Sequence, residues 1–342
     1  MLSKVAELVR CSKRPFHCVD PTTSKSNSKQ SLTSMDCCSR ALSASRTTAA
    51  PWISLYKELL GKDISFNAAG MDYNYQTAAV EAVRADGNSP AAWLALATSQ
   101  PYMVEVWPDE KFNELQCYCN ALQCPPERVD CVTKATVWQA FGQYLEYRWE
   151  DFDEKTTIVV GDRTVGIVEC FVESVRSFEG SSTLLSLALA MRGIVRMSNM
   201  HYCFARQPYM PLVDHVEVLP GRRWTALQCV ARSLRGESAN GVTSWYTAAV
   251  IQFIDEDDSD ERLVLNGQSY DMMQCLVKSW LADPRPDREK TIELTAALST
   301  QFNRFKNLNN VPDVAVDGET YHLEVDPYRG YARRWVEVNI TN

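Results

Sequence analysis

The sequence predicts an α+β fold, a helix-rich body with several small antiparallel β-hairpins, preceded by an extended N-terminal arm. Three observations favour this fold class. Helical periodicity dominates the chain after residue 50, three two-residue turns have the chemistry of β-hairpins, and the first 50 residues are too polar to form a core. We therefore expect two regions, an extended basic Ser/Thr-rich arm at residues 1–50 and a globular α+β body at residues 51–342.

The arm is the least hydrophobic part of the chain. Between Pro21 and Asp36, eight of sixteen residues are Ser or Thr and only three are apolar. Ordering a backbone costs roughly 1–2 kcal/mol per residue, and so little apolar surface cannot offset that cost. We expect the arm to become ordered only against another molecule.

Charge is distributed unevenly along the chain. The formal charge is −8, with eight Lys or Arg against three acids in residues 1–50 (+5) and 27 against 40 in the remainder (−13). An acidic body does not attract nucleic acid through its overall field, whereas a basic arm can reach phosphates or an acidic neighbour. The candidate contact residues in the arm are Arg10, Lys13, Arg14, Lys25 and Lys29.

The body begins with helical segments. Apolar residues recur at helical spacing after Pro51, and Asp72 to Ala85 is predicted as a helix that ends at Asp86-Gly87. Ser89 and Pro90 are expected to cap and start a helix at residues 91–99. Further helices are expected at residues 126–149, 182–197 and 287–305. The segment 182–197 is apolar on nearly all sides, so we expect it to be the buried central helix.

Three hairpins are predicted from their turns, Gly161-Asp162, Asn266-Gly267 and Asp317-Gly318. Asn-Gly and Asp-Gly favour type I′ turns, in which both central residues have positive φ. The hairpins span residues 158–165, 263–270 and 314–322, and a further strand is expected at residues 248–254.

The order of these elements excludes several architectures. The hairpins are separated by helices rather than chained together, which argues against a sandwich or jelly roll. Strands and helices do not alternate regularly, so a doubly wound sheet is not expected. We also expect no internal repeat with a period of 20 to 50 residues.

Four of the twelve cysteines lie close together in the sequence, Cys117, Cys119, Cys124 and Cys131. Their spacing lacks the C-x2-C pair that brings two thiolates to one zinc ion. Free cysteine is among the most often buried residue types. We therefore expect small buried thiols and assign no metal.

No catalytic or cofactor signature is present. The four histidines, His17, His201, His215 and His322, form no H-E-x-x-H pair, and neither G-x-S-x-G nor G-x-x-x-x-G-K-[ST] occurs. The acidic stretch at residues 255–261 lacks the glycine and the final glutamate of an EF-hand and is expected to be a solvated loop. We expect neither enzymatic activity nor a cofactor, and an enzyme whose residues are scattered in sequence is an alternative.

The stretch from Pro327 to Trp335 interleaves arginines with aromatic residues. Such a mixture fits a protein interface, a nucleic-acid contact, or guanidinium groups packed on the domain's own rings. Interface and internal packing are favoured over nucleic acid. The candidate contact residues are Arg329, Arg333, Arg334 and Trp335.

The N-terminal stretch and the apolar segments bear on location. Met1 to Arg14 is charged every few residues and has no apolar core of a secretory signal. The longest uncharged apolar-rich run, Gly180 to Met191, covers twelve residues, where a membrane helix needs about 20. We expect a reducing compartment and no membrane partner. The Arg- and Ser-rich start also fits a mitochondrial presequence, which is an alternative.

These expectations favour a structural role. A basic arm of low hydrophobicity on an acidic body is typical of subunits of large assemblies, where the arm lies across neighbours. We expect a viral capsid shell protein of the minor, clamp or cementing type, in the virion or host cytoplasm. Its expected partners are other capsid subunits, with weak RNA contact through the arm and no small-molecule substrate. A cellular scaffold, such as a mitochondrial ribonucleoprotein component, is the second alternative.

Overall fold

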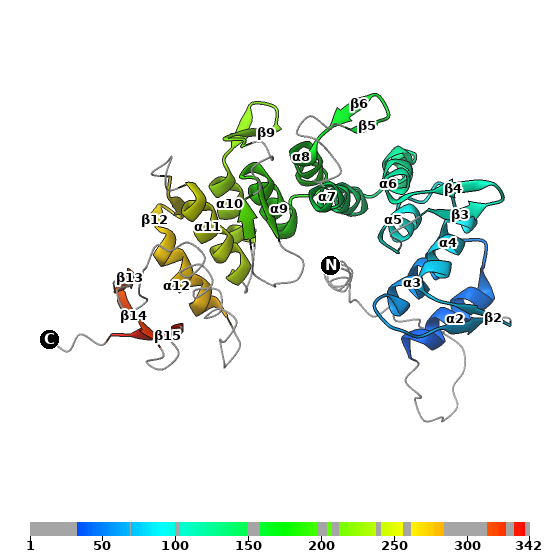
Figure 1. Cartoon of the computed structure of the whole chain (residues 1–342), viewed down its shortest axis with the longest axis horizontal. Coiled ribbons are helices and arrows are strands. Elements are labelled where there is room, and N and C mark those ends of the chain that lie inside the picture. The colour runs from blue at the N-terminus through cyan, green and yellow to red at the C-terminus, as the bar shows by residue number, and fades with distance from the viewer. Residues whose placement is uncertain are drawn as a thin grey trace, which may run out of the picture. The chain divides into compact units, whose positions relative to one another are not determined.

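The computed structural model describes residues 33–68, 70–99, 103–148, 158–196, 204–206, 212–236, 241–255, 261–283, 313–325 and 332–338. The predicted fold class is confirmed, because the described residues form many helices and several small antiparallel sheets (Figure 1). The extended arm is not confirmed. Residues 1–32 lie outside the described residues, and Ser34–Ala44, predicted as extended, forms helix α2.

The chain forms two compact units. Unit 1 comprises Met1–Val137 and Val159–Thr164, and unit 2 comprises Trp138–Ile158 and Val165–Asn342. The boundary crosses helix α7 (Cys131–Tyr147) and the hairpin of β5 (Ile158–Val160) and β6 (Arg163–Val165).

Unit 1 is built from helices that pack in chain order, joined by two hairpins. Leu42 and Cys38 of α2 are buried where α2 packs on α3, so this part of the predicted arm lies on its own chain. The elements that follow α2 are α3 (Ala49–Leu59), β1 (Phe66–Ala68), β2 (Met71–Tyr73), α4 (Tyr75–Ala85), α5 (Pro90–Ser99), β3 (Val104–Trp107), β4 (Glu110–Phe112), α6 (Glu114–Gln123) and η1 (Pro126–Arg128).

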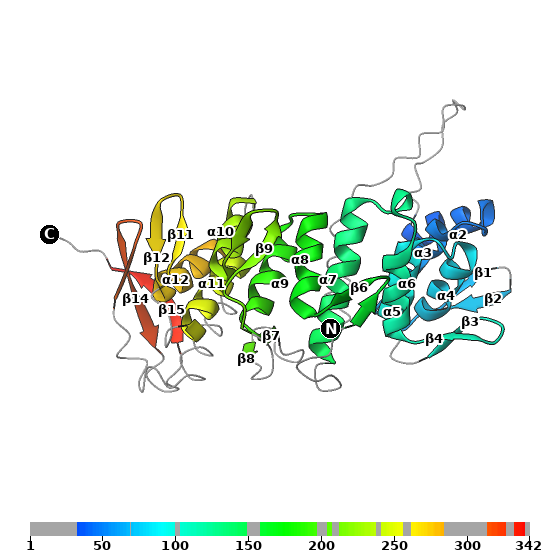
Figure 2. The ribbon, with the colours of Figure 1, turned by 90° about the horizontal axis from the view of Figure 1, so that it is seen from above.

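Unit 2 continues the same plan. Helices α8 to α12 pack side by side in chain order, as Figure 2 shows. Their buried side chains form a large apolar core. Its elements after β6 are α8 (Ile167–Ser177), α9 (Ser181–Met191), β7 (Ile194–Arg196), β8 (Phe204–Arg206), β9 (Val216–Leu219), β10 (Arg222–Trp224), α10 (Ala226–Gly236), α11 (Val242–Asp255), β11 (Leu263–Leu265), β12 (Gln268–Tyr270), α12 (Met272–Ala282), β13 (Val314–Val316), β14 (Glu319–Val325) and β15 (Ala332–Glu337).

A hairpin followed directly by a helix recurs along the chain, whereas no repeat with a period of 20 to 50 residues was expected from the sequence. Within the described residues, hairpins that a helix follows directly begin at residues 66, 104, 158, 216 and 263. The spacing between successive hairpins therefore varies from 38 to 58 residues. Segments of different length between the layers hide the repeat from a search for one fixed period.

The junction between hairpin and helix has the same chemistry in successive layers. The last strand residue is buried or half-buried, and the next residue caps the helix with its side chain or backbone in a capping box. The capping residues are Asn74, Asn113, Gly166, Thr225 and Asp271. Four residues later stands a small, fully buried side chain, at Ala78, Cys117, Cys170, Cys229 and Cys275. A small residue here lets each hairpin lie close to its helix.

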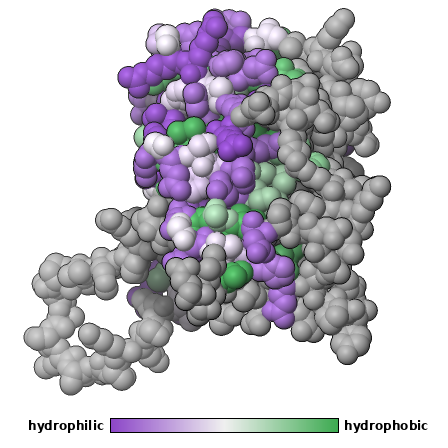
Figure 3. Space-filling view, turned by 90° about the vertical axis from the view of Figure 1, so that its left-hand side faces the viewer, coloured by the Kyte–Doolittle hydropathy of each residue, from purple (hydrophilic) through white to green (hydrophobic). Residues whose placement is uncertain are grey.

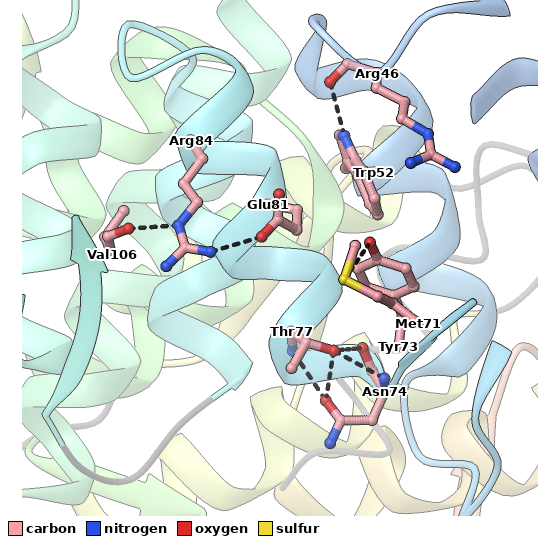
Figure 4. A network of polar contacts seen from close by, with 9 residues as sticks. All are labelled: Arg46, Trp52, Met71, Tyr73, Asn74, Thr77, Glu81, Arg84 and Val106. Atoms are coloured by element: carbon pink, nitrogen blue, oxygen red, sulfur yellow. Dashed lines mark hydrogen bonds and ion pairs between the residues drawn. The ribbon is translucent and has the colours of Figure 1, made fainter. Parts of the chain in front are cut away.

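A tryptophan from the helix before a hairpin packs on the last residue of that hairpin. The ring centroids are 5.0 Å apart in Trp52–Tyr73, Trp93–Phe112 and Trp245–Tyr270. The Trp52 indole donates to the carbonyl of Arg46 at 3.0 Å, which Figure 4 shows. These tilted and edge-to-face pairs add specific contacts beyond simple burial.

In each unit a Glu–Arg pair ties a helix to the hairpin of the next layer. In unit 1, Arg84 of α4 donates from Nε to the carbonyl of Val106 and from Nη1 to Glu81, at 2.7 Å for the latter (Figure 4). In unit 2, Arg176 of α8 donates from Nε to the carbonyl of Val218 at 2.6 Å and from Nη1 to Glu173 at 2.7 Å. The two units therefore carry the same structural module.

Several local predictions are corrected by the structure. The predicted helix at 72–85 is the end of β2 followed by α4, and the helix predicted at 182–197 ends at Met191 before strand β7. The strand predicted at 248–254 lies within α11, because a short apolar run fits a buried helix equally well. The helix predicted at 126–149 is the 3-10 turn η1 followed by α7.

Other local predictions are confirmed. The hairpins at residues 158–165, 263–270 and 314–322 are present. Asn266 and Asp317 have positive φ, as the predicted turns require. The predicted helix at 287–305 lies outside the described residues.

The last described sheet has the order β13-β14-β15. Its apolar residues Val314, Val316 and Leu323 form a small core with Trp335 and Val277. The face of the structure shown in Figure 3 is mostly hydrophilic over the described residues, with small separate hydrophobic patches.

Candidate binding site

An open pocket lies in unit 1 beside the hairpin of β3 and β4. Its volume is about 330 Å³, at the lower end of the range for ligand pockets. The pocket is lined by uncharged residues only. They are Gly87, Asn88, Trp93, Trp107, Phe112, Asn120, Gln123 and Cys124.

Three aromatic rings form the apolar side of this pocket. Trp93 is buried, and its indole nitrogen donates to the carbonyl of Gly87 at 2.7 Å. Trp107 and Phe112 are half-buried, with ring centroids 6.0 Å apart and planes at 79° to each other. Both pack edge-on to Trp93, at 6.1 and 5.0 Å. The two accessible rings thus form a fixed wedge.

Amide side chains form the polar side of the pocket. Asn88, Asn120 and Gln123 are half-buried or exposed, and their amide groups make no hydrogen bond within the described part of the chain. Each amide can donate and accept at the same time. They are available to a ligand that presents both kinds of group.

The cysteine of the pocket is not a nucleophile. Cys124 is buried and donates a hydrogen bond to the carbonyl of Asn120 at 3.3 Å. Burial raises the pKa of this thiol to about 11. The thiol is therefore protonated near neutral pH, and the thiolate is the reactive form.

Local structure holds the wedge in place. Asp109 has φ 66°, which closes the tight turn between Trp107 and Phe112. Asn113 and Gln116 then form a capping box that starts α6 directly after Phe112. The hydrogen bond from Arg84 to Val106 fixes the first strand (Figure 4). Backbone hydrogen bonds and caps thus orient the two rings without any ligand.

The outer faces of the hairpins are a second candidate surface. In each hairpin the central residue of the first strand points away from the core, because side chains alternate along a strand. These exposed residues are Asn67, Glu105, Val159, Glu217, Val264 and Ala315. Exposed Lys111 and Arg223 lie opposite Glu105 and Glu217 in their hairpins. We call this set, with its cross-strand neighbours, the hairpin faces.

The basic residues predicted from the sequence are brought together only in part. Arg10, Lys13, Arg14, Lys25, Lys29 and Arg329 lie outside the described residues. Arg333 and Arg334 belong to strand β15. Trp335 is 1% exposed in the core beneath the last sheet, which corresponds to the internal packing that was expected from the sequence beside an interface role.

The described cysteines and histidines do not gather at one site. Cys117 and Cys124 are buried as expected, Cys119 is half-buried and Cys131 is exposed. Among the described residues, no group of three His, Cys, Asp or Glu side chains could hold a metal ion. His322 is exposed and lies 2.7 Å from Asp313. His215 is exposed, and His17 and His201 lie outside the described residues.

The pocket residues were not predicted from the sequence. Trp107 and Phe112 flank the turn Pro108-Asp109-Glu110, which lacks the glycine of the predicted hairpins. One signal for this hairpin was present in the sequence. Residues 104–117 and residues 216–229 are identical at seven of fourteen aligned positions.

No protein-family model matches the chain, and no curated protein or solved structure matches it either. No helix within the described residues has the length and apolarity needed to cross a membrane.

Proposed function

We propose that this protein is a non-enzymatic scaffold that binds another protein through its recurring hairpin and helix layers. The proposal is carried by one observation: inward positions of the layers keep their chemistry, whereas the outward positions include polar, charged and apolar residues. Repeat proteins with this property use their extended outer surfaces for binding. A β-turn followed by two helices is also the plan of ankyrin units.

The contrast between inner and outer positions is sharp within single hairpins. In β9, Val216 and Val218 are buried, and Glu217 between them is exposed. In β11, buried Leu263 is followed by Val264, which is 55% exposed. Folding accounts for the buried residues. The outward residues, acid–base pairs on two hairpins and an exposed valine on a third, lie where a partner surface would contact them.

The experiment compares two matched triple variants of the full chain. The hairpin-face variant carries Lys111→Ser, Arg223→Ser and Val264→Ser. The control variant carries Lys134→Ser, Arg235→Ser and Val132→Ser, at exposed positions on helices. Both variants should unfold at the wild-type temperature, because exposed substitutions usually change stability by less than about 0.5 kcal/mol.

The readout is the mass of the native particle in cell extract, measured by size exclusion with light scattering. The wild type and the control variant should run well above the 38.7 kDa of one chain, and the hairpin-face variant should run as the free chain. A hairpin-face variant that keeps the complex, or a wild type that is a free monomer, contradicts the proposal.

The capsid role predicted from the sequence stays a prediction. It depended on residues 1–50 being ordered by neighbouring subunits, and residues 1–32 lie outside the described residues. The same mass measurement on the purified chain alone tests it. Particles of many copies formed without a partner would favour a self-assembling shell over a scaffold for other proteins.

A further inference from the structure

We infer that the pocket of unit 1 binds the side chain of an arginine that a partner protein supplies. The inference rests on the proposed scaffold function and names the ligand of one site on it. It depends on a comparison within the chain, because unit 2 fills the equivalent position with an arginine of its own.

The two positions are equivalent because their surroundings are built in the same way. Arg84 of α4 and Arg176 of α8 both stand ten residues after the cap of their helix. They donate to the carbonyls of Val106 and Val218, the third residues of β3 and β9. The hairpin is therefore fixed to the preceding helix by the same contact in each unit.

In unit 2 this position is closed by an arginine, an aromatic ring and a carboxylate. The guanidinium of Arg232 lies over the ring of Trp224, with Cζ 4.4 Å from the ring centroid. It also donates from Nε and Nη2 to the carboxylate of Glu179, at 2.7 and 3.1 Å. Arginine can make both contacts because its planar group stacks on a ring and offers paired donors to a carboxylate.

In unit 1 the ring is kept and the two charged residues are replaced. Counted from the helix caps, Phe112 stands where unit 2 has the tryptophan, Asn120 where it has the arginine, and Gly87 where it has the glutamate. All three residues line the pocket. The pocket therefore lies where unit 2 holds an arginine side chain and its carboxylate partner.

Edge-on contacts between the rings are compatible with a bound cation. In the layer of α12, Trp245 and Tyr270 are also edge-on, with centroids 5.0 Å apart and planes at 70°. The ammonium of Lys278 nonetheless lies 5.5 and 5.8 Å from these two rings. Lys278 occupies the same helix position as Arg232 and Asn120. Two layers of unit 2 thus place a cation where α6 has an amide.

The polar lining of the pocket also suits a guanidinium group. Arginine carries five N–H donors and no acceptor, and the amide oxygens of Asn88, Asn120 and Gln123 can accept from them. The lining contains no charged residue to hold the α-ammonium and α-carboxylate groups of free arginine. An arginine within a polypeptide presents its side chain without those charges. We therefore assign the occupant to a partner protein.

The experiment titrates the full chain with a blocked peptide, Gly-Gly-Arg-Gly-Gly, at constant ionic strength. Tryptophan fluorescence reports on binding, because Trp93 and Trp107 line the pocket. We expect saturable binding in the roughly millimolar range, since only one side chain is held. The same peptide with citrulline, which has the shape of arginine without its charge, should bind at least about fivefold more weakly.

Variants at the equivalent positions test the comparison between the units. Asn120→Arg should abolish binding, because the chain's own guanidinium then fills the pocket. Arg232→Asn combined with Glu179→Gly should create a second site in unit 2, and equilibrium dialysis should show twice as much peptide bound at saturation. The control Ser39→Arg adds the same charge at an exposed position of α2 and should bind as the wild type does. Circular dichroism confirms that each variant is folded.

The inference would be overturned by a folded wild type that does not bind the arginine peptide, by equal binding of the citrulline peptide, or by unchanged binding in Asn120→Arg. Absence of a second site in the unit 2 variant would contradict the equivalence of the two positions. Free arginine that binds more tightly than the blocked peptide would overturn the inference in favour of a small-molecule site. The scaffold proposal survives any of these results if the native complex still depends on the hairpin faces.

Discussion

The hairpin of β3 and β4 in unit 1 and the hairpin of β9 and β10 in unit 2 have related sequences, but their last residues differ in exposure. Both begin Val-Glu-Val, both turn after a proline, and both are followed by a helix with Leu-Gln-Cys in its first turn. In unit 1 the last hairpin residue, Phe112, opens into a pocket. In unit 2 the equivalent residue, Trp224, is 7% exposed and has Arg232 stacked over it at 4.4 Å.

One helix position accounts for this difference. The residue seven positions after the capping residue differs between helices. It is Asn120 in α6, Arg232 in α10 and Lys278 in α12. The long cation of Arg232 covers Trp224, and Lys278 lies 5.8 Å from the ring of Tyr270. Asn120 is too short to reach across Phe112 in the same way. The inward residues thus stabilise each layer. One outward helix residue determines whether the aromatic ring at the end of the hairpin is accessible to a ligand.

The largest expected effect tests the module that the two units share. Arg176→Ala should lower the free energy of unfolding by about 2–4 kcal/mol, because it removes the ion pair with Glu173, which is largely buried, and the hydrogen bonds to two carbonyls of β9. Arg84→Ala should cost only about 1 kcal/mol, since Arg84 is more exposed and bonds one carbonyl. Urea unfolding measures both.

Equal costs for the two arginines would contradict this ranking. Lysine substitutions provide a control for charge, because lysine keeps the positive charge and loses the planar set of donors. Arg176→Lys should therefore recover little of the lost stability.

An exchange of the two helix residues tests the pocket itself. Arg232→Asn should uncover Trp224 and cost about 1 kcal/mol, the sum of a cation–π contact and an exposed pair with Glu179. Asn120→Arg should cover Phe112 at little cost in stability. Acrylamide quenching of tryptophan fluorescence should rise in the first variant, because Trp224 becomes accessible. Unchanged quenching in that variant would show that this position does not control access.

The smallest expected effect concerns Lys278, which occupies this helix position in α12. The hydrogen bond and charge of Lys278 lower the pKa of Asp317, which forms the turn of the next hairpin. A lowered carboxyl pKa adds stability above its unfolded value, about 3.9, and this stability is lost as pH falls through the folded pKa. Asp317 is 46% exposed, so we expect less than about 1 kcal/mol.

Lys278→Met should therefore be less stable than the wild type at pH 7, and the gap should shrink in acid. Urea unfolding at several pH values measures the gap. A gap that stays constant down to pH 2 would mean that the Asp317 pair contributes nothing and that Lys278 acts through its contacts with Trp245 and Tyr270 alone.

Local chemistry made parts of this fold predictable. Asn266-Gly267 and Asp317-Gly318 specify their turns by backbone conformation alone, so these hairpins could be read from a few residues. The helix boundary at Asp86 and Pro90 followed from caps and proline in the same way. The class of fold followed from these elements and from the helices between them.

The remainder depended on tertiary contacts that a local pattern does not contain. The apolar segment at 248–254 fits a strand or a helix, and packing between α10 and α12 selects the helix. The hairpin that carries Trp107 was missed because Asp109 adopts positive φ without a glycine beside it. Trp335 looked like a contact residue because aromatic and arginine residues mix equally well in interfaces and cores.

The unequal spacing of the hairpins has a consequence for how such chains change over time. Each layer packs mainly on the layers before and after it, so a connection can lengthen without disturbing layers further along. Distant kin of this chain would then share short stretches, such as the valine-rich strand, the cap and the Leu-Gln-Cys turn, separated by inserts of any size. Searches with those stretches taken singly should find kinship where whole-length alignment does not.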